Sequence, residues 1–244
     1  MGVNDVCEYP KVLIIGYFNL KKPVGITTNN LFKGWPKGRI AIASFNKLEE
    51  MFTPYCADYY QLGSNEVSYV FPFNLVLQKG VSKGYSNVTQ INIDNRGRIK
   101  KSTQKNRLAG SLISILNYCS LITGLFLIKT KYRISNEFLT WINWFDPDII
   151  YATVEDINRI AYIIDIKKLL GKKLVIHIMD DWIHTLNSYT IFPKYWSTRL
   201  TRTFAKLLKY SDLNLAISEK MAKEYQSKYK KTFYPFHNPI NLSH

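Results

Sequence analysis

Cysteine is scarce in this sequence. Three of its 244 residues are cysteines, namely Cys7, Cys56 and Cys119. Their number is odd, their spacing is wide, and no CxxC occurs, which argues against both a disulfide framework and a zinc site. We therefore expect no bound metal, and the pattern fits a reducing cytoplasm.

Targeting signals and repeats are also missing. The N-terminal stretch MGVNDVCEYPKVLIIG has no basic region followed by a long apolar run, which argues against a secretory signal. We find no internal repeat and no low-complexity tract. With 46% hydrophobic and 21% charged residues, the composition is that of a globular protein. The length allows one large α/β domain or two small ones.

Acidic residues are few. Eighteen Asp and Glu stand against 33 Lys and Arg, giving a net charge of +15. Such a charge favours an anionic partner: nucleic acid, a phosphorylated substrate or an acidic membrane surface. Basic residues concentrate around 96–107, 194–209 and 220–231. Each cluster can equally be a solvated helix face or loop.

Sequence signals for two protein classes are absent. We find no helix-turn-helix, zinc-knuckle, RNP or KH pattern, and the aromatic residues lie within apolar runs rather than among the basic ones. This argues against nucleic-acid binding. No GxGxxG follows the first expected strand and there is no P-loop, so a dinucleotide-dependent oxidoreductase or another nucleotide-binding enzyme is also disfavoured.

The apolar runs that are present predict an α/β fold. KVLIIG at 11–16 and RIAIAS at 39–44 are typical of buried parallel strands. Between them we expect a loop with Pro23 and Gly25, then a helix capped by a residue of 27–29. From 145 onward, strands and helices alternate to about 241. This predicts a Rossmann-like parallel sheet with helices on both faces, with ligands beyond the carboxyl ends of the strands.

The middle of the chain gives weaker signals. Residues 68–77, around Pro72, suggest an extended segment or edge strand, and 81–107 suggest a basic surface excursion. Residues 108–128 are apolar and just long enough to span a bilayer. Six small or polar residues make this segment only mildly hydrophobic, so we expect a buried or membrane-surface helix rather than a spanning one.

Four stretches resemble retaining glycosyltransferases of the GT-B type, the large family-four group in particular. These are KVLIIG with its following loop, FDPDIIYAT, KLVIHIMDDW, and SDLNLAISEKMAKEY with the later FHNPIN. They cover most of the chain outside 52–140. Two departures stand out: Met179 occupies the position of the family's histidine, and the first loop has one glycine where many relatives have two.

The resemblance implies that residues 1–244 form the N-terminal, acceptor-side domain. The donor would bind a C-terminal domain absent from this chain, so this chain alone is expected to be inactive. No cofactor is implied, because the nucleotide-sugar donor is a substrate. The acceptor would be a glycan or a lipid-linked sugar in bacterial surface polysaccharide synthesis. With the charge, this suggests a cytoplasmic protein peripheral at an anionic inner membrane face. The alternative is a non-catalytic subunit that recruits a separate donor-binding chain to the membrane.

Candidate site residues follow from the ends of the expected strands. Asp180 and Asp181 are the candidate catalytic pair, as hydrogen-bond acceptors for an acceptor hydroxyl or as a general base. A helix cap or surface turn is the alternative for both. Trp182 is a candidate for stacking on a sugar ring, or a core residue.

The remaining candidates are substrate-binding residues. Gly25 would let the backbone amides of Ile26 and Thr27 approach a diphosphate at a helix N-terminus; a tight turn is the alternative. The resemblance places Thr153 and Glu155 beside the sugar or acceptor, although Glu155 is equally a charge at a helix start. Ser218 is first a helix cap and second a ligand residue. We interpret His177 as a satisfied core histidine.

Overall fold

The structure is a computed structural model that describes residues 9–16, 18–75, 77, 80–88, 107–154, 157–181 and 190–236. Its strands are β1 (Val12–Gly16), β2 (Ile40–Ser44), β3 (Asp58–Gln61), β4 (Val67–Tyr69), β5 (Lys83–Tyr85), β6 (Thr130–Tyr132), β7 (Ile149–Thr153), β8 (Lys173–Ile178), β9 (Leu213–Ala216) and β10 (Tyr234–Pro235). Its α-helices are α1 (Pro23–Leu31), α2 (Leu48–Met51), α3 (Arg107–Thr123), α4 (Asn136–Phe145), α5 (Ile157–Leu170), α7 (Pro193–Leu207) and α8 (Glu219–Tyr229).

An eight-stranded sheet forms the centre of the molecule, in the order β10-β9-β8-β7-β1-β2-β3-β5. All its strands are parallel except β5, which pairs antiparallel with β3. From β1 the chain first moves outward through β2 and β3, and later returns to place β7 on the other side of β1. The strand order therefore reverses between β1 and β7, which confirms the predicted Rossmann-like α/β fold.

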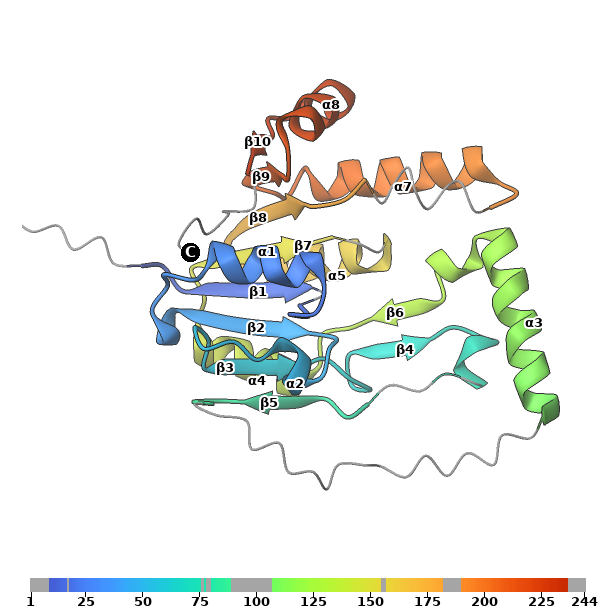
Figure 1. Cartoon of the computed structure of the whole chain (residues 1–244), viewed down its shortest axis with the longest axis horizontal. Helices are drawn as coiled ribbons and strands as arrows, with labels where there is room; N and C mark the ends of the chain where they lie inside the picture. The colour runs from blue at the N-terminus through green and yellow to red at the C-terminus, as the bar shows by residue number, and fades with distance from the viewer. Residues whose placement is uncertain are drawn as a thin grey trace, which may run out of the picture.

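Helices cover both faces of this sheet (Figure 1). One face packs Leu13, Ile150 and Ile176 into a core with side chains of α4, α5, α7 and α8. The other packs Val12 and Ile42 under the end of α1 and under α2. Burial on both faces explains why the central strands are continuous apolar runs rather than alternating ones.

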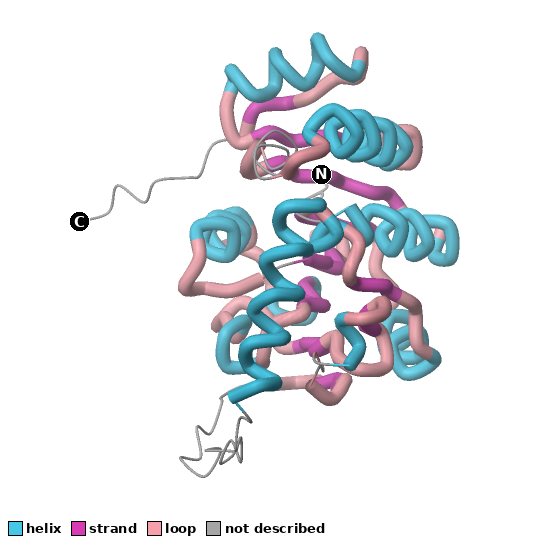
Figure 2. The backbone as a smooth tube through the Cα atoms, turned by 90° about the vertical axis from the view of Figure 1, so that its right-hand side faces the viewer, coloured by secondary structure: helices cyan, strands magenta, loops and turns pink. Residues whose placement is uncertain are grey.

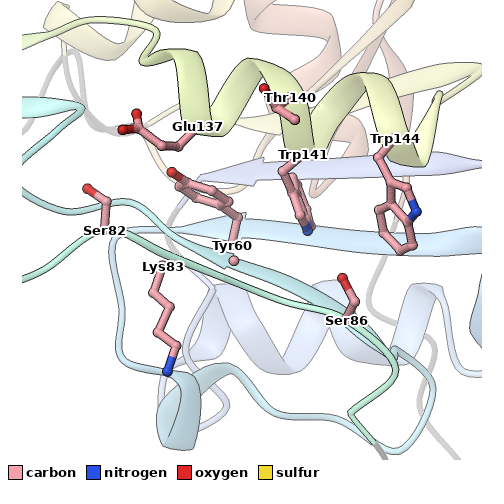
Figure 3. A pocket seen from close by; sticks show the side chains of 9 residues that line it. Tyr60, Ser82, Lys83, Ser86, Glu137, Thr140, Trp141 and Trp144 are labelled. Atoms are coloured by element: carbon pink, nitrogen blue, oxygen red, sulfur yellow. The ribbon is translucent and has the colours of Figure 1, made fainter.

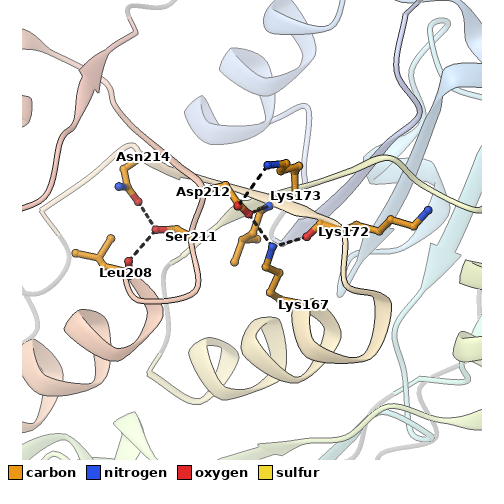
Figure 4. A network of polar contacts seen from close by, with 8 residues as sticks. Lys167, Lys172, Lys173, Leu208, Ser211, Asp212 and Asn214 are labelled. Carbon is orange, nitrogen blue, oxygen red and sulfur yellow. Dashed lines mark hydrogen bonds and ion pairs between the residues drawn. The ribbon is translucent and has the colours of Figure 1, made fainter.

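A polar network fixes the amino ends of β8 and β9 (Figure 4). Asp212 accepts hydrogen bonds from Nζ of Lys167 and from the backbone N–H of Leu174, both at 2.7 Å. Next to it, Ser211 donates to Oδ1 of Asn214 at 2.7 Å. These groups lie at the edge of the sheet opposite the carboxyl ends, so they stabilise the scaffold.

Helix α1 begins earlier than predicted. It starts at Pro23 rather than around residues 27–29, so Gly25 belongs to its first turn and not to the loop. Proline suits the first helical position, because its φ is already helical and its missing N–H would have no intrahelical partner. Thr27 and Thr28 are buried inside the helix, so neither caps it.

The segment between β3 and β7 departs from the sheet. Strands β4 and β6 form a separate two-stranded antiparallel sheet, so the edge strand expected within 68–77 is confined to the start of that segment. Of the expected excursion at 81–107, β5 joins the main sheet as an edge strand, and 89–106 lie outside the described residues. We call residues 62–134, without β5, the excursion.

Helix α3 stands apart from the sheet, beyond the carboxyl ends of the strands (Figures 1 and 2). It ends at Thr123, because Gly124 adopts φ of 77° and starts a 3-10 turn at Leu125–Leu127. Its C-terminal end is anchored to α7: Nε1 of Trp196 donates to the carbonyl of Thr123 at 2.8 Å. Among the helices that the structure describes, none is both long and apolar enough to cross a bilayer.

Candidate functional site at the carboxyl ends of the strands

The strand ends at the reversal point are in close contact. Gly16 ends β1 with φ of +148°, and Thr153 ends the neighbouring β7. A Cβ built on Gly16 would lie only 2.3 Å from Oγ1 of Thr153. Only glycine therefore allows this backbone conformation and this approach. The sequence offered one signal for Gly16, its place at the end of the apolar run KVLIIG, but no role was predicted for it.

Buried polar groups hold the loop that follows β1. Ser44, at the end of β2, accepts a hydrogen bond from the N–H of Phe18 at 3.1 Å. Asn46 donates to Oε2 of Glu50 at 2.9 Å, and Asn19 donates to the same oxygen at 3.3 Å. The loop is thereby tied to the end of β2. Sequence reasoning missed these residues, although polar side chains directly after RIAIAS were a usable signal.

The predicted phosphate-binding residues lie on α1. A Cβ at Gly25 would approach the carbonyl oxygen of Asn19 to 2.1 Å, so this glycine lets α1 pack against the preceding loop. The N–H of Ile26 donates to the carbonyl of Lys22 at 3.1 Å, and Thr27 is buried. The amide of Ile26 is thus already used within the helix.

Asp180 and Asp181 follow the end of β8 and differ in their surroundings. Asp180 is exposed. Asp181 is partly buried, and its Oδ1 accepts a hydrogen bond from the hydroxyl of Tyr225 on α8 at 3.1 Å. Burial, and next the nearby Asp181, raise the pKa of Tyr225, which keeps its hydroxyl protonated as a donor. Asp180 is therefore the more accessible carboxylate of the two.

The other predicted residues are distributed along the same edge. Thr153 is buried at the end of β7. Ser218 follows β9 and caps α8 by accepting from the N–H of Met221 at 3.2 Å, as its first interpretation held. Glu155 and Trp182 lie outside the described residues.

His177 lies just inside this edge, level with Thr153 in the strand register. Its Nδ1 is 2.6 Å from the hydroxyl of Tyr151, while its buried Nε2 has no partner among the described residues. The ring is buried as expected, but only one of its two nitrogens is satisfied. Burial lowers the pKa of His177 to about 4, so the ring is neutral at pH 7.

A second candidate surface combines part of the excursion with the start of α7. Large apolar side chains are exposed on α3, on the turns after β4 and after α3, and at the start of α7. These residues, which we call the α3 apolar surface, are Phe71, Leu75, Ile115, Tyr118, Leu121, Leu125, Ile191, Phe192 and Tyr195. Two contacts link parts of this set: Phe71 and Leu125 line one groove of about 130 Å³ together with Cys119, and the N–H of Ile191 donates to the carbonyl of Ile122 on α3 at 2.9 Å.

Basic residues adjoin the α3 apolar surface. Lys194, Arg199 and Arg202 are exposed on α7 and line one shallow depression with Tyr195. An exposed apolar patch rimmed by cations is typical of a surface that meets a partner or an anionic membrane. In Figure 1 α3 and the start of α7 lie on the side toward which the parallel strands point.

Comparison with known proteins gives no match in sequence and a distant likeness in structure. No protein-family model matches the sequence, and no curated protein matches it. Among solved structures, that of HepE from Anabaena in complex with UDP is similar, with a TM-score of 0.45 and 12% identity over 95% of this chain and 44% of HepE. This chain thus spans less than half the length of that protein. A likeness of this degree carries no functional argument, so the candidate site rests on this chain's own residues.

Proposed function

We propose that this chain is the acceptor-side domain of a GT-B-type glycosyltransferase, which moves a sugar from a nucleotide-sugar to a glycan or lipid-linked acceptor. The observation that carries the proposal is the position of exposed Asp180, which follows the buried strand β8 on the carboxyl edge of the sheet, one strand beyond the reversal between β1 and β7. Ligands of doubly wound sheets bind at that edge.

In this proposal Asp180 accepts a hydrogen bond from the acceptor hydroxyl or removes its proton. Asp181 positions the end of β8 through Tyr225. Thr153, Glu155, Ser218 and Trp182 contribute polar and stacking contacts to the sugars. The start of α1, at Gly25, Ile26 and Thr27, lies toward the donor phosphates, and the amide of Ile26 takes no direct part because it donates to Lys22. The nucleotide-sugar is a substrate, and no further cofactor takes part.

The α3 apolar surface supports membrane association of this domain. Each Lys or Arg near an anionic leaflet contributes on the order of 1 kcal/mol of attraction, and the exposed apolar residues add burial in the headgroup region. The strand-end edge would then face a lipid-linked acceptor. This fits a cytoplasmic protein bound at the inner face of a bacterial membrane and acting in surface polysaccharide synthesis.

The same surface favours a second candidate function. A non-catalytic subunit that recruits a donor-binding chain to the membrane needs the α3 apolar surface and no acid or base at the strand ends. The two candidates therefore differ in what they require of Asp180.

The experiment has two arms. First, vesicles of neutral lipid carrying a polyprenyl-diphosphate-linked saccharide are titrated with the wild-type chain and with Asp180→Asn. Second, release of nucleoside diphosphate from UDP-, GDP- and TDP-sugars is measured when the chain is combined with a donor-binding domain. We expect acceptor-dependent release that falls about 100-fold or more in Asp180→Asn, the size of a general-base effect.

The outcomes separate the candidates. Unchanged release by Asp180→Asn, together with loss of release when the α3 apolar surface is made polar, would favour the recruiting subunit. Absence of saccharide binding by the wild-type chain, with no nucleotide release from any donor, would exclude the glycosyltransferase domain.

A further inference from the structure

An open groove of about 570 Å³ runs between α4 and β5, at the opposite end of the sheet from β10 (Figure 3). Its volume falls within the range of about 300–1,000 Å³ that is usual for small-molecule sites. Neither α4 nor β5 belongs to the row of parallel strands whose carboxyl ends form the candidate site. The groove is therefore a separate feature of the fold.

One face of α4 supplies the first wall. Glu137, Trp141 and Trp144 recur at helical spacing, so they project from the same side of the helix. Trp141 is 7% exposed and packs with its ring centroid 5.4 Å from that of Tyr60. Trp144, one turn further on, is 55% exposed. An indole that lines a groove without being buried presents an apolar face to whatever enters it.

Strand β5 and its flanks supply the second wall. Ser82, Gly84 and Ser86 line the groove from this side. A Cβ on Gly84 would lie 3.2 Å from Cδ1 of Trp141 and 3.4 Å from Cδ2 of Tyr60. The absence of a side chain at position 84 thus leaves the space beside these two rings open. Nε1 of Trp141, the neighbour of Cδ1, is buried and has no hydrogen-bond partner in the described part of the chain.

A buried carboxyl group fixes one end of the groove. Glu66 is completely buried and accepts hydrogen bonds from the hydroxyls of Tyr60, Ser82 and Ser135. Ser135 in turn caps α4. Glu66 therefore ties β3, the start of β5 and the N-terminus of α4 together, so both walls are held in place before any ligand arrives.

The charge of the groove differs from that of the whole chain. Although the chain carries +15, the groove presents the exposed carboxylate of Glu137. The ammonium of Lys83 is turned away from α4 (Figure 3) and lies 5.0 Å from the ring centroid of Tyr85. A carboxylate accepts hydrogen bonds from neutral hydroxyl groups and repels anions.

From these observations we infer that the α4–β5 groove is a binding site for a neutral saccharide, which stacks on Trp144 and donates hydroxyl hydrogen bonds to Glu137. Thr140 and Ser86 supply further hydroxyl groups. That the saccharide is a segment of the acceptor glycan, held away from the site of transfer, rests on the proposed function. Binding itself requires neither a donor nor transfer.

A peptide that adds a strand to β5 is the competing occupant, because β5 is an edge strand of the sheet. Such a peptide would bind through the backbone groups of β5 and would not need the side chains of Trp144 and Glu137. Substitutions at these two positions therefore separate the two occupants.

The test follows the indole N–H signals by two-dimensional ¹⁵N NMR; the chain has five tryptophans. Maltohexaose, cellohexaose and chitohexaose are the neutral probes, and a hexamer of galacturonate is the anionic one. We expect at least one neutral probe to shift the Trp144 signal, which the Trp144→Ala spectrum identifies. The dissociation constant should rise about tenfold or more in Trp144→Ala and also rise in Glu137→Gln.

Tyr234→Ala is the matched control, because Tyr234 is an aromatic residue of similar exposure, 53%, on β10 at the other end of the sheet; it should bind as wild type does. Unshifted indole signals elsewhere show that the variants are folded. The inference is overturned if no neutral probe shifts the Trp144 signal, if galacturonate binds the groove as tightly, or if Trp144→Ala binds normally. If the groove binds a saccharide but the transfer assay shows no nucleotide release, the inference about the groove stands and only the proposed glycosyltransferase function fails.

Discussion

The sheet and the excursion use their polar and apolar residues in opposite ways. In the sheet, polar groups at the strand ends are paired: buried Ser44 donates to buried Asn46, which in turn donates to the half-buried Glu50 of α2. In the excursion, large apolar side chains remain in solvent: Phe71 is 73% exposed and Tyr118 66%. The difference indicates that the sheet is built to hold its shape, while the excursion is built to meet a partner.

This contrast predicts which substitutions lower stability and which affect binding. Changes in the sheet should lower stability, because each disturbs a packed or hydrogen-bonded group. Changes on the α3 apolar surface should leave stability nearly intact and affect binding, because those side chains have little protein contact to lose.

The largest expected effect on stability is at Gly16. Gly16→Ala combines an unfavourable φ with a clash against Thr153, so the free energy of unfolding should fall by roughly 4–5 kcal/mol. Urea denaturation followed by circular dichroism measures it. Gly38→Ala is the control, since nothing lies within 4 Å of a Cβ there. Equal effects of the two substitutions would contradict the described contact of β1 with β7.

Substitution of Glu66 tests the junction between the sheet and the excursion. It begins the excursion yet is completely buried among its hydrogen-bond donors. Glu66→Ala leaves those donors unpaired and should cost about 3 kcal/mol of unfolding free energy. Glu137→Gln, at an exposed carboxyl group nearby, should cost less than about 0.5 kcal/mol. A neutral effect of Glu66→Ala would show that the junction is held by other contacts.

The pH dependence of stability should show that the His177 ring is buried in its neutral form. Its folded-state pKa, about 4, is below the value of 6.5 for an unperturbed histidine, so the unfolded chain takes up the proton first as the pH falls. This contribution to stability is complete above about pH 6.5 and is lost between about pH 6.5 and 4, by on the order of 2–3 kcal/mol. Melting temperatures measured across this range should fall less steeply in His177→Gln. Parallel curves for both proteins would contradict the burial of the ring.

Ser218 has the smallest expected effect. Its hydroxyl oxygen caps α8, so Ser218→Ala should lower the free energy of unfolding by about 1 kcal/mol, and Ser218→Asp should restore most of it. If Ser218→Asp instead abolished saccharide binding at unchanged stability, its role as a ligand residue would outweigh its role as a cap.

The parallel strands of the sheet were predictable from the sequence, whereas its antiparallel edge strand β5 was not. KVLIIG and KLVIHI form strands that lie between two layers of helices. Because both faces of such strands are covered, most of their residues are apolar, and these apolar runs are visible in the sequence. β5, by contrast, is only three residues long and contains Gly84, which gives no periodic signal. Its place in the sheet depends on pairing with β3, more than 20 residues earlier in the chain.

The candidate site was predictable only in part. Strand-end reasoning correctly placed Asp180 and Ser218 just after clear strands, while their roles in binding and catalysis stay predictions. It missed the contact of Gly16 with Thr153 and the pairing of Asn19 with Glu50, because both contacts join segments that are far apart in the sequence, the second pair by 31 residues. The groove at Trp144 was missed for the same reason: its two walls, α4 and β5, are separated by about 50 residues of sequence.

Co-sedimentation with vesicles tests most directly the central claim that the excursion meets the membrane. Wild type and the triple variant Ile115→Ser, Tyr118→Ser, Leu121→Ser are compared on neutral and anionic lipid, at low and high salt. We predict salt-sensitive binding of wild type to anionic vesicles, and at least about tenfold weaker binding of the variant with its melting temperature unchanged. Failure of wild type to bind either vesicle, or equal binding by the variant, would contradict the account.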